Sequence, residues 1–90
     1  MNNKIALESL VMDLKRVALG YHRNSLVMAQ RFYEEALARK NEIDPLTLRP
    51  YAKILLEKIV GLQNNTNDAI AEDALMLSTL LQNYMRTYPI

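Results

Sequence analysis

Apolar residues recur every three or four positions along most of the chain, which is the spacing of amphipathic helices. This spacing predicts four helices, at about residues 3–19, 25–40, 50–62 and 68–88. Because the links between them are short, consecutive helices must turn back on each other. We therefore expect an all-α fold, an antiparallel four-helix bundle, in one domain over residues 1–90. The clearest core stripes are Leu7, Leu10, Leu14, Val17 and Tyr21 in the first helix and Ile70, Ala74, Leu77, Leu81, Tyr84 and Tyr88 in the last; the second helix has Leu26, Ala29, Tyr33, Ala36 and Leu37.

Capping residues and helix breakers set the expected ends of these helices. Gly20 is expected to end the first helix, because glycine readily takes the left-handed conformation that follows many helix C-termini. Asn24 or Ser25 can cap the second helix, and Thr66 or Asn67 can cap the fourth. In each case a short side-chain oxygen accepts a hydrogen bond from a backbone N–H that the helix leaves free.

The stretch NEIDPLTLRP, residues 41–50, divides the chain into two halves. Asp44 can cap a short turn over residues 45–48, because a proline in the first position of a helical turn loses no hydrogen bond. Pro50 disfavours one continuous helix, since its ring would clash with the carbonyl four residues earlier. We expect the next helix to begin near Pro50, and a kinked helix running on from the turn is the alternative. Two apolar residues should fold under the end of the bundle: Leu46 and Leu48.

Some apolar residues lie off the core stripes, where a plain bundle does not require them. On the first predicted helix they are spaced seven apart: Ile5, Met12 and Leu19. On the third and fourth they are Ile54 and Val60, and Leu75, Met76 and Leu80. Two interpretations are open. Either the bundle buries more than one stripe and leaves single apolar residues exposed, or these residues contact a partner, a second copy or a membrane-embedded target.

Composition and charge argue against several classes of protein. The chain contains no cysteine, which excludes a disulfide framework and thiolate metal sites. Eleven basic and ten acidic residues give a net charge of +1 without a basic block, so the charge pattern of a nucleic-acid-binding protein is missing. Glu8 and Asp13 interrupt the apolar part of the N-terminal stretch, unlike in a signal peptide, and no apolar run reaches the roughly 20 residues of a membrane span. We expect a cytoplasmic protein without a direct membrane span.

The sequence shows no pattern typical of catalysis or metal binding. His22 is the only histidine, and no glutamate stands three residues before it, as a di-iron bundle would require. The adjacent acids Glu34 and Glu35, and Glu72 and Asp73, are expected to lie on solvated helix faces. Two glycines are too few for a phosphate-binding loop. We therefore expect no enzymatic activity, no cofactor and no metal.

The order of these segments resembles that of the small immunity proteins of class IIa bacteriocin producers. The shared local motif is Glu42-Ile43-Asp44-Pro45, at the end of a charged second helix, and the resemblance extends over nearly the whole chain. It implies an antiparallel four-helix bundle in the cytoplasm of a Gram-positive bacterium. It also implies that the protein protects its host from a pore-forming peptide whose receptor is the mannose phosphotransferase permease.

Members of this family engage the receptor–peptide complex, and their C-terminal half determines which bacteriocin is recognised. That half corresponds here to the third and fourth helices and the segment 85–90, whereas many members extend further beyond the last helix.

The alternative to an immunity protein is a helical adaptor or regulator that acts through protein contacts, with a possible dimer surface at Ile5, Met12 and Leu19. For the immunity function, the residues expected to bind the partner are Leu75, Met76, Leu80, Arg86 and Tyr88. Apolar anchors with a neighbouring arginine and tyrosine are typical of binding hot spots.

Overall fold

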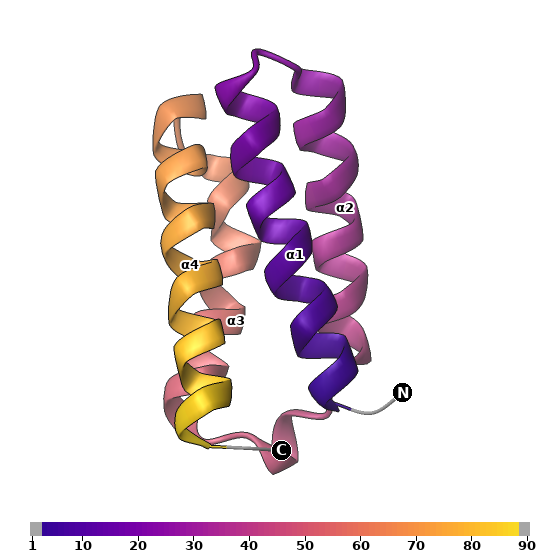
Figure 1. The fold of residues 1–90 in the computed structure, drawn as a ribbon, viewed down its shortest axis with the longest axis vertical. Coiled ribbons are helices and arrows are strands. Elements are labelled where there is room, and N and C mark those ends of the chain that lie inside the picture. Colours follow the sequence, from indigo (N-terminus) through magenta and orange to yellow (C-terminus); the bar gives the residue numbers. More distant parts are fainter. Residues whose placement is uncertain (1–2, 89–90) are drawn as a thin grey trace.

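The computed structural model describes residues 3–88, and within this range it contains helices and no strand. The four α-helices are α1 (Asn3–His22), α2 (Leu26–Glu42), α3 (Pro50–Gly61) and α4 (Asn67–Thr87), with short 3₁₀ turns η1 (Pro45–Thr47) and η2 (Leu62–Asn64). Consecutive helices run in opposite directions, and α1 packs between α2 and α4 while α3 lies on the far side of the bundle (Figure 1). The expected all-α bundle is confirmed, with dimensions of 36 × 21 × 20 Å.

The core is built mainly from the stripes of α1, α3 and α4. Fully buried leucines and an isoleucine from these helices fill its centre: Leu7, Leu10, Leu14, Ile59, Leu77 and Leu81. The outer ends of two predicted stripes are exposed instead. Leu26 is 57% exposed in the first turn of α2, and Tyr88 is 39% exposed after the end of α4. Leu26 lies with other residues of α2 alone around a shallow surface groove, and Tyr88 follows the last residue of α4.

Gly20 does not end the first helix, so that prediction is wrong. α1 continues to His22, and the left-handed residue after it is Asn24, with φ of 56°. Gly20 is buried and lies against α2, where an added Cβ would come within 2.6 Å of the backbone nitrogen of Ala29. Its role is therefore to let two helices approach closely. Ser25 caps α2 as one of the two expected residues, accepting a hydrogen bond from the Met28 N–H at 3.3 Å.

The corner at residues 41–50 contains two separate helical segments. The Asp44 carboxylate accepts a hydrogen bond from the Leu46 N–H at 3.0 Å and so caps η1, as expected. Arg49 has an extended backbone, with ψ of 155°, and this excludes the kinked continuous helix. Leu48 is buried under the bundle, but Leu46 is 86% exposed and does not fold under it. The turn can present only one of these alternating side chains to the core.

The start of α1 and the end of α4 both form hydrogen bonds to this corner. The Asn3 side chain, at the start of α1, accepts from the Asp44 N–H at 3.0 Å and donates to the Asp44 carbonyl at 3.1 Å. The Tyr84 hydroxyl, near the end of α4, accepts from the Arg49 N–H at 3.1 Å. Polar backbone groups that the turn leaves free are thus satisfied by side chains far away in the sequence.

Tyr33 joins α2 to the end of α3. Its hydroxyl donates to the carbonyls of Ile59 at 2.7 Å and Val60 at 3.1 Å, and burial raises the pKa of this hydroxyl above its usual value of 10.0.

We expect Tyr33→Phe to lower the free energy of unfolding by about 1 kcal/mol, the usual net value of a lost hydrogen bond. Urea denaturation measures this change. Tyr51→Phe is the control, since Tyr51 is 50% exposed, and an equal effect of both substitutions would contradict the prediction.

Candidate binding surface

The outward face of α1 carries the three apolar residues predicted as a dimer surface. Ile5, Met12 and Leu19 are 54%, 45% and 38% exposed, so all three lie outside the core. Because they are spaced seven residues apart, they lie along one ridge of the helix. α1 packs between α2 and α4 (Figure 1), and a groove lies along α1 on each of these two sides. Met12 contributes to the groove shared with α2, and Leu19 to the groove shared with α4.

The groove between α1 and α4 has an apolar lining and charged edges. It has a volume of about 450 Å³ and lies between the last turns of α1 and the first turns of α4. Apolar groups from both helices line it: Ala18 and Leu19, and Ala71 and Leu75. Lys15 lies at its α1 edge, and Asp68 and Glu72 lie at its α4 edge. Concave apolar surface with charges at the rim is what a helix or peptide ligand requires.

The five residues predicted to bind a partner do not form one patch. Leu75 is 52% exposed and lies in the groove with Leu19, whereas Met76, 46% exposed, points about 100° further round α4. Leu80 is half-buried and packs against the core. Arg86 and Tyr88 lie more than ten residues further along the chain, about 16–20 Å from Leu75 for a helical rise of ~1.5 Å per residue.

Tyr88 contributes to the corner rather than to the groove. Its ring centroid lies 5.3 Å from that of Tyr84 and 4.1 Å from the guanidinium carbon of Arg49. An arginine over an aromatic face is a favourable cation–π arrangement. The last two residues of the segment 85–90, which the resemblance connects with specificity, lie outside the described residues. The structure therefore brings Leu19 of the predicted dimer surface together with Leu75 of the predicted partner surface, and Met76, Leu80, Arg86 and Tyr88 lie outside this groove.

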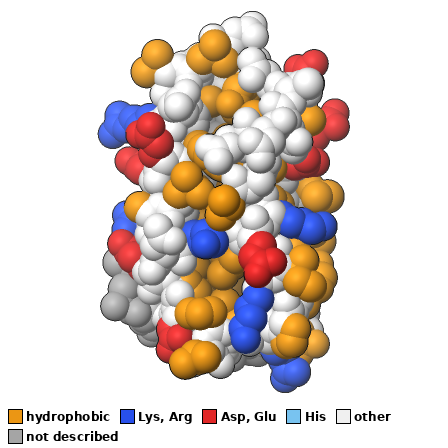
Figure 2. Space-filling model, turned by 180° about the vertical axis from the view of Figure 1, so that it is seen from behind, with side chains coloured by type: hydrophobic (Ala, Val, Ile, Leu, Met, Phe, Trp, Pro, Cys, Tyr) orange, Lys and Arg blue, Asp and Glu red, His pale blue; other side chains and the backbone are white. Residues whose placement is uncertain are grey.

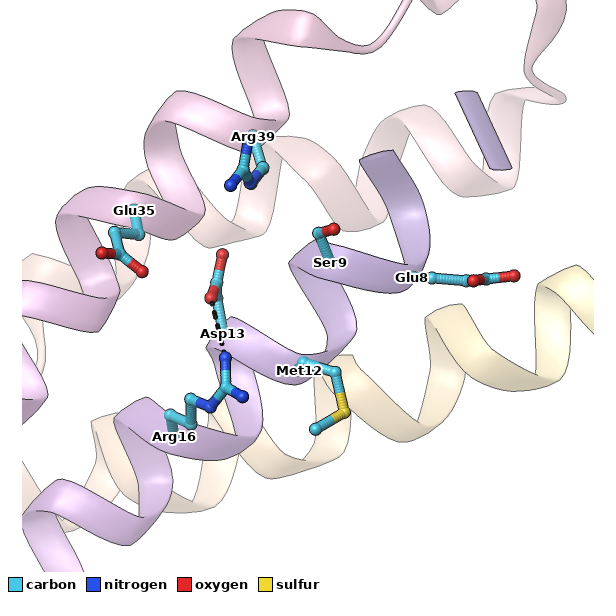
Figure 3. A pocket seen from close by; sticks show the side chains of 7 residues that line it. All are labelled: Glu8, Ser9, Met12, Asp13, Arg16, Glu35 and Arg39. Carbon is cyan, nitrogen blue, oxygen red and sulfur yellow. Dashed lines mark ion pairs between the residues drawn. The ribbon is translucent and has the colours of Figure 1, made fainter. Parts of the chain in front are cut away.

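The second groove, between α1 and α2, contains a residue that the sequence patterns did not single out. Asp13 is only 4% exposed, and it lines a polar cavity of about 400 Å³ together with Arg16, Glu35 and Arg39 (Figure 3). The signal was present in the spacing, because Leu10, Asp13 and Val17 follow each other at steps of three and four. A charged residue on an apolar stripe is a candidate for a buried functional group.

Asp13 is incompletely paired. Its Oδ1 lies 3.7 Å from Nη1 of Arg16, too far for a hydrogen bond, and its Oδ2 has no hydrogen-bond partner among the described residues. Burial is the largest cause that raises the pKa of this carboxyl above its usual value of 3.8, and the charge of Glu35 raises it further. Arg39 and Arg16 lower the pKa but do not offset these effects.

The side of the molecule on which α3 lies carries further exposed apolar residues. Ile54 and Val60 are 51% and 43% exposed, and neither is covered by a neighbouring helix. Figure 2 shows apolar side chains in several patches on this side, with lysine, arginine and acidic side chains between and beside them. Ile54 lines neither the α1–α2 groove nor the α1–α4 groove, so it serves below as a comparison site.

Other types of site find no support within residues 3–88. No three histidine, aspartate or glutamate side chains of this range are grouped to hold a metal ion, and His22 lies at the edge of the α1–α4 groove. None of the helices in this range combines the length and the apolarity needed to cross a bilayer. Comparisons with models of protein families, with curated proteins and with solved structures found no match to this chain.

Proposed function

We propose that the protein is a non-enzymatic immunity protein that protects a bacteriocin-producing bacterium by binding the receptor–bacteriocin complex from the cytoplasmic side. The observation that supports this proposal best is the apolar groove between α1 and α4, in which Leu19 and Leu75 lie together. A protein that acts by binding needs such a surface and needs no catalytic group. The resemblance in helix order and in the Glu42-Ile43-Asp44-Pro45 step supplies the kind of partner.

Binding at this groove would combine burial of apolar surface with orientation by charge. Covering a half-exposed leucine such as Leu75 contributes a favourable free energy on the order of 1 kcal/mol. The acids Asp68 and Glu72 on one edge and Lys15 on the other would favour a partner helix with basic groups on one side. The proposed contact surface is therefore Leu19, Ala71 and Leu75 with these rim charges.

Expression of the gene in a strain sensitive to class IIa bacteriocins tests this function, and we expect survival when the cognate peptide is added. The substitution Leu75→Lys should abolish protection, because it places a charge in the centre of the apolar contact. Ile54→Lys is the matched control, since Ile54 is 51% exposed and Leu75 is 52% exposed. Survival in a killing assay and circular dichroism of both variants give the result.

Two outcomes would contradict this proposal. Unchanged killing across a panel of class IIa peptides would remove the immunity function. Equal protection by Leu75→Lys and by the wild type would remove the α1–α4 groove as the contact surface, while leaving the function itself supported.

The second candidate is a helical adaptor that forms a homodimer through the α1 ridge, and the exposure of Ile5, Met12 and Leu19 favours it. Such a dimer would bury the ridge against its symmetric copy. In that case Met12→Glu should convert the dimer to a monomer in sedimentation experiments at tens of micromolar protein. Val27→Glu, at an 83% exposed position on α2, should have no effect. A wild-type monomer at the same concentration would exclude this candidate.

A further inference from the structure

The cavity between α1 and α2 has an acidic character. Three carboxylates and two guanidinium groups line it: Glu8, Asp13, Glu35, Arg16 and Arg39. Asp13, the buried member of this group, lies between the two arginines, and Glu35 lies beside it on α2 (Figure 3). Its volume of about 400 Å³ and its position next to the exposed Met12 give it an opening to solvent.

The protein's own arginines do not satisfy Asp13. Figure 3 shows one carboxylate oxygen turned toward Arg16 and the other toward Arg39 across a gap. The Arg16 guanidinium lies 5.3 Å above the ring of Phe32, and Arg39 donates to both oxygens of Glu42 at 3.4 Å. Oδ2 of Asp13 is consequently left without a donor, although its side chain is 95% buried, with a relative exposure of 5%. A buried carboxylate in this state costs free energy until a donor reaches it.

The chemistry of the lining selects the group that could supply this donor. An anion would meet three carboxylates, and a neutral donor would leave the buried charge uncompensated. A cationic nitrogen supplies both a hydrogen bond and the opposite charge, and such charge-assisted bonds are the stronger ones. The charges of Arg39 and Arg16 do not offset the effects of burial and of Glu35 on the Asp13 carboxyl, whose pKa stays raised, so a further positive charge would stabilise the ionised carboxylate.

We propose that this cavity binds a cationic group on an alkyl chain, an ammonium or guanidinium of the kind carried by lysine, arginine and polyamines, with Asp13 as its acceptor. The side chains of Arg16 and Arg39 lie on either side of the carboxylate (Figure 3), and turning them outward would enlarge the space for the ligand. Arg16 is 46% exposed and Arg39 is 37% exposed, so each can be solvated after this movement. Met12 is the apolar side chain that lines the cavity with these charged groups, and the alkyl chain could contact it. The proposal does not depend on a partner at the α1–α4 groove.

Titration of the purified protein with n-butylammonium and n-butylguanidinium, followed by amide NMR, tests this site. We expect saturable shifts confined to the residues that line the cavity, with dissociation constants on the order of millimolar for ligands this small. n-Butanol, which has the same alkyl chain without the charge, should cause no saturable shift. Asp13→Asn should weaken binding by about tenfold or more, since it removes the charged acceptor, whereas Glu57→Gln on α3 should leave it unchanged.

A measurement on the wild type keeps the test independent of whether Asp13→Asn folds. A bound cation should lower the pKa of the Asp13 carboxyl, which carbon NMR of the side chain reports directly. Two further ligands distinguish the sources of the cation, namely 1,4-diaminobutane and a capped alanine-based helical peptide with one central lysine. Tighter binding of the peptide supports the site with a protein partner, and tighter binding of the diamine supports it with a small amine.

The proposal is overturned by any of three results. The first is the lack of saturable shifts in the wild type at tens of millimolar n-butylammonium. The second is equal affinity of the wild type and a folded Asp13→Asn variant. The third is binding by Arg39→Gln without binding by the wild type, which would show that Arg39 itself occupies the position next to Asp13.

Discussion

Replacing Gly20 with alanine lowers the free energy of unfolding, by about 1–3 kcal/mol, the usual cost of overpacking a filled interior. The added Cβ would lie 2.6 Å from the backbone nitrogen of Ala29 and 2.8 Å from its Cα. Because these are backbone atoms, no rotation of a side chain relieves the contact, and α2 must move away from α1. In a free helix the same substitution would be favourable by up to about 1 kcal/mol, so the sign of the effect reports the helix contact. Urea denaturation followed by circular dichroism measures it.

Gly61→Ala is the control for this experiment. A Cβ at Gly61 meets no atom within 4 Å, and its φ of −77° suits any residue. We expect this substitution to raise the free energy of unfolding by about 0.4–1 kcal/mol, through the unfolded state and helix propensity. If Gly20→Ala also stabilised the protein, the close approach of α1 and α2 at Ala29 would be wrong.

The spacing of apolar residues predicts most of the fold because it depends on the helical repeat alone. The stripe from Leu7 to Val17 and the stripe from Ile70 to Tyr84 are buried along their lengths. The cap at Asp44 was equally predictable, since a proline at the next position and a short acidic side chain act locally. Features that depend on a single residue and its immediate neighbours can be inferred without knowing the packing of the helices.

Features set by contacts between helices could not be predicted in the same way. Gly20 has the sequence context of a helix end, but its function is contact with Ala29 on another helix. The predicted partner residues Leu75 and Met76 are both exposed, as their positions on the helix suggested. Only the position of α1 beside α4 shows that Leu75 faces Leu19 and that Tyr88 belongs to the corner.

Replacing Asp13 with leucine raises the free energy of unfolding at neutral pH, by about 1–3 kcal/mol, the cost of burying a polar group without a full set of partners. Asp13 occupies a position on the core side of α1 and is 4% exposed, and the adjacent cavity of about 400 Å³ gives room for the longer side chain. Urea denaturation of the two proteins measures the difference. Glu8→Leu, at an exposed position on the same helix, is expected to change the free energy of unfolding by no more than about 0.5 kcal/mol.

The dependence of stability on pH identifies the cause of this gain, and Asp13→Asn is the variant that isolates it. Burial raises the pKa of Asp13 in the folded state above its usual value of 3.8, so the folded protein holds this proton more tightly than the unfolded chain. Well below pH 3.8 the carboxyl is protonated in both the folded and the unfolded state, so it does not destabilise the folded protein. As the pH rises from there through the folded-state pKa, the free energy of unfolding of the wild type falls relative to that of Asp13→Asn. Above the folded-state pKa the difference between the two proteins is constant. A difference that grew toward low pH would instead mean that the carboxylate is stabilised by Arg16 or Arg39. If both Asp13→Leu and Asp13→Asn are more stable than the wild type at neutral pH, this carboxylate destabilises the folded state. That is expected for a group that serves binding rather than folding.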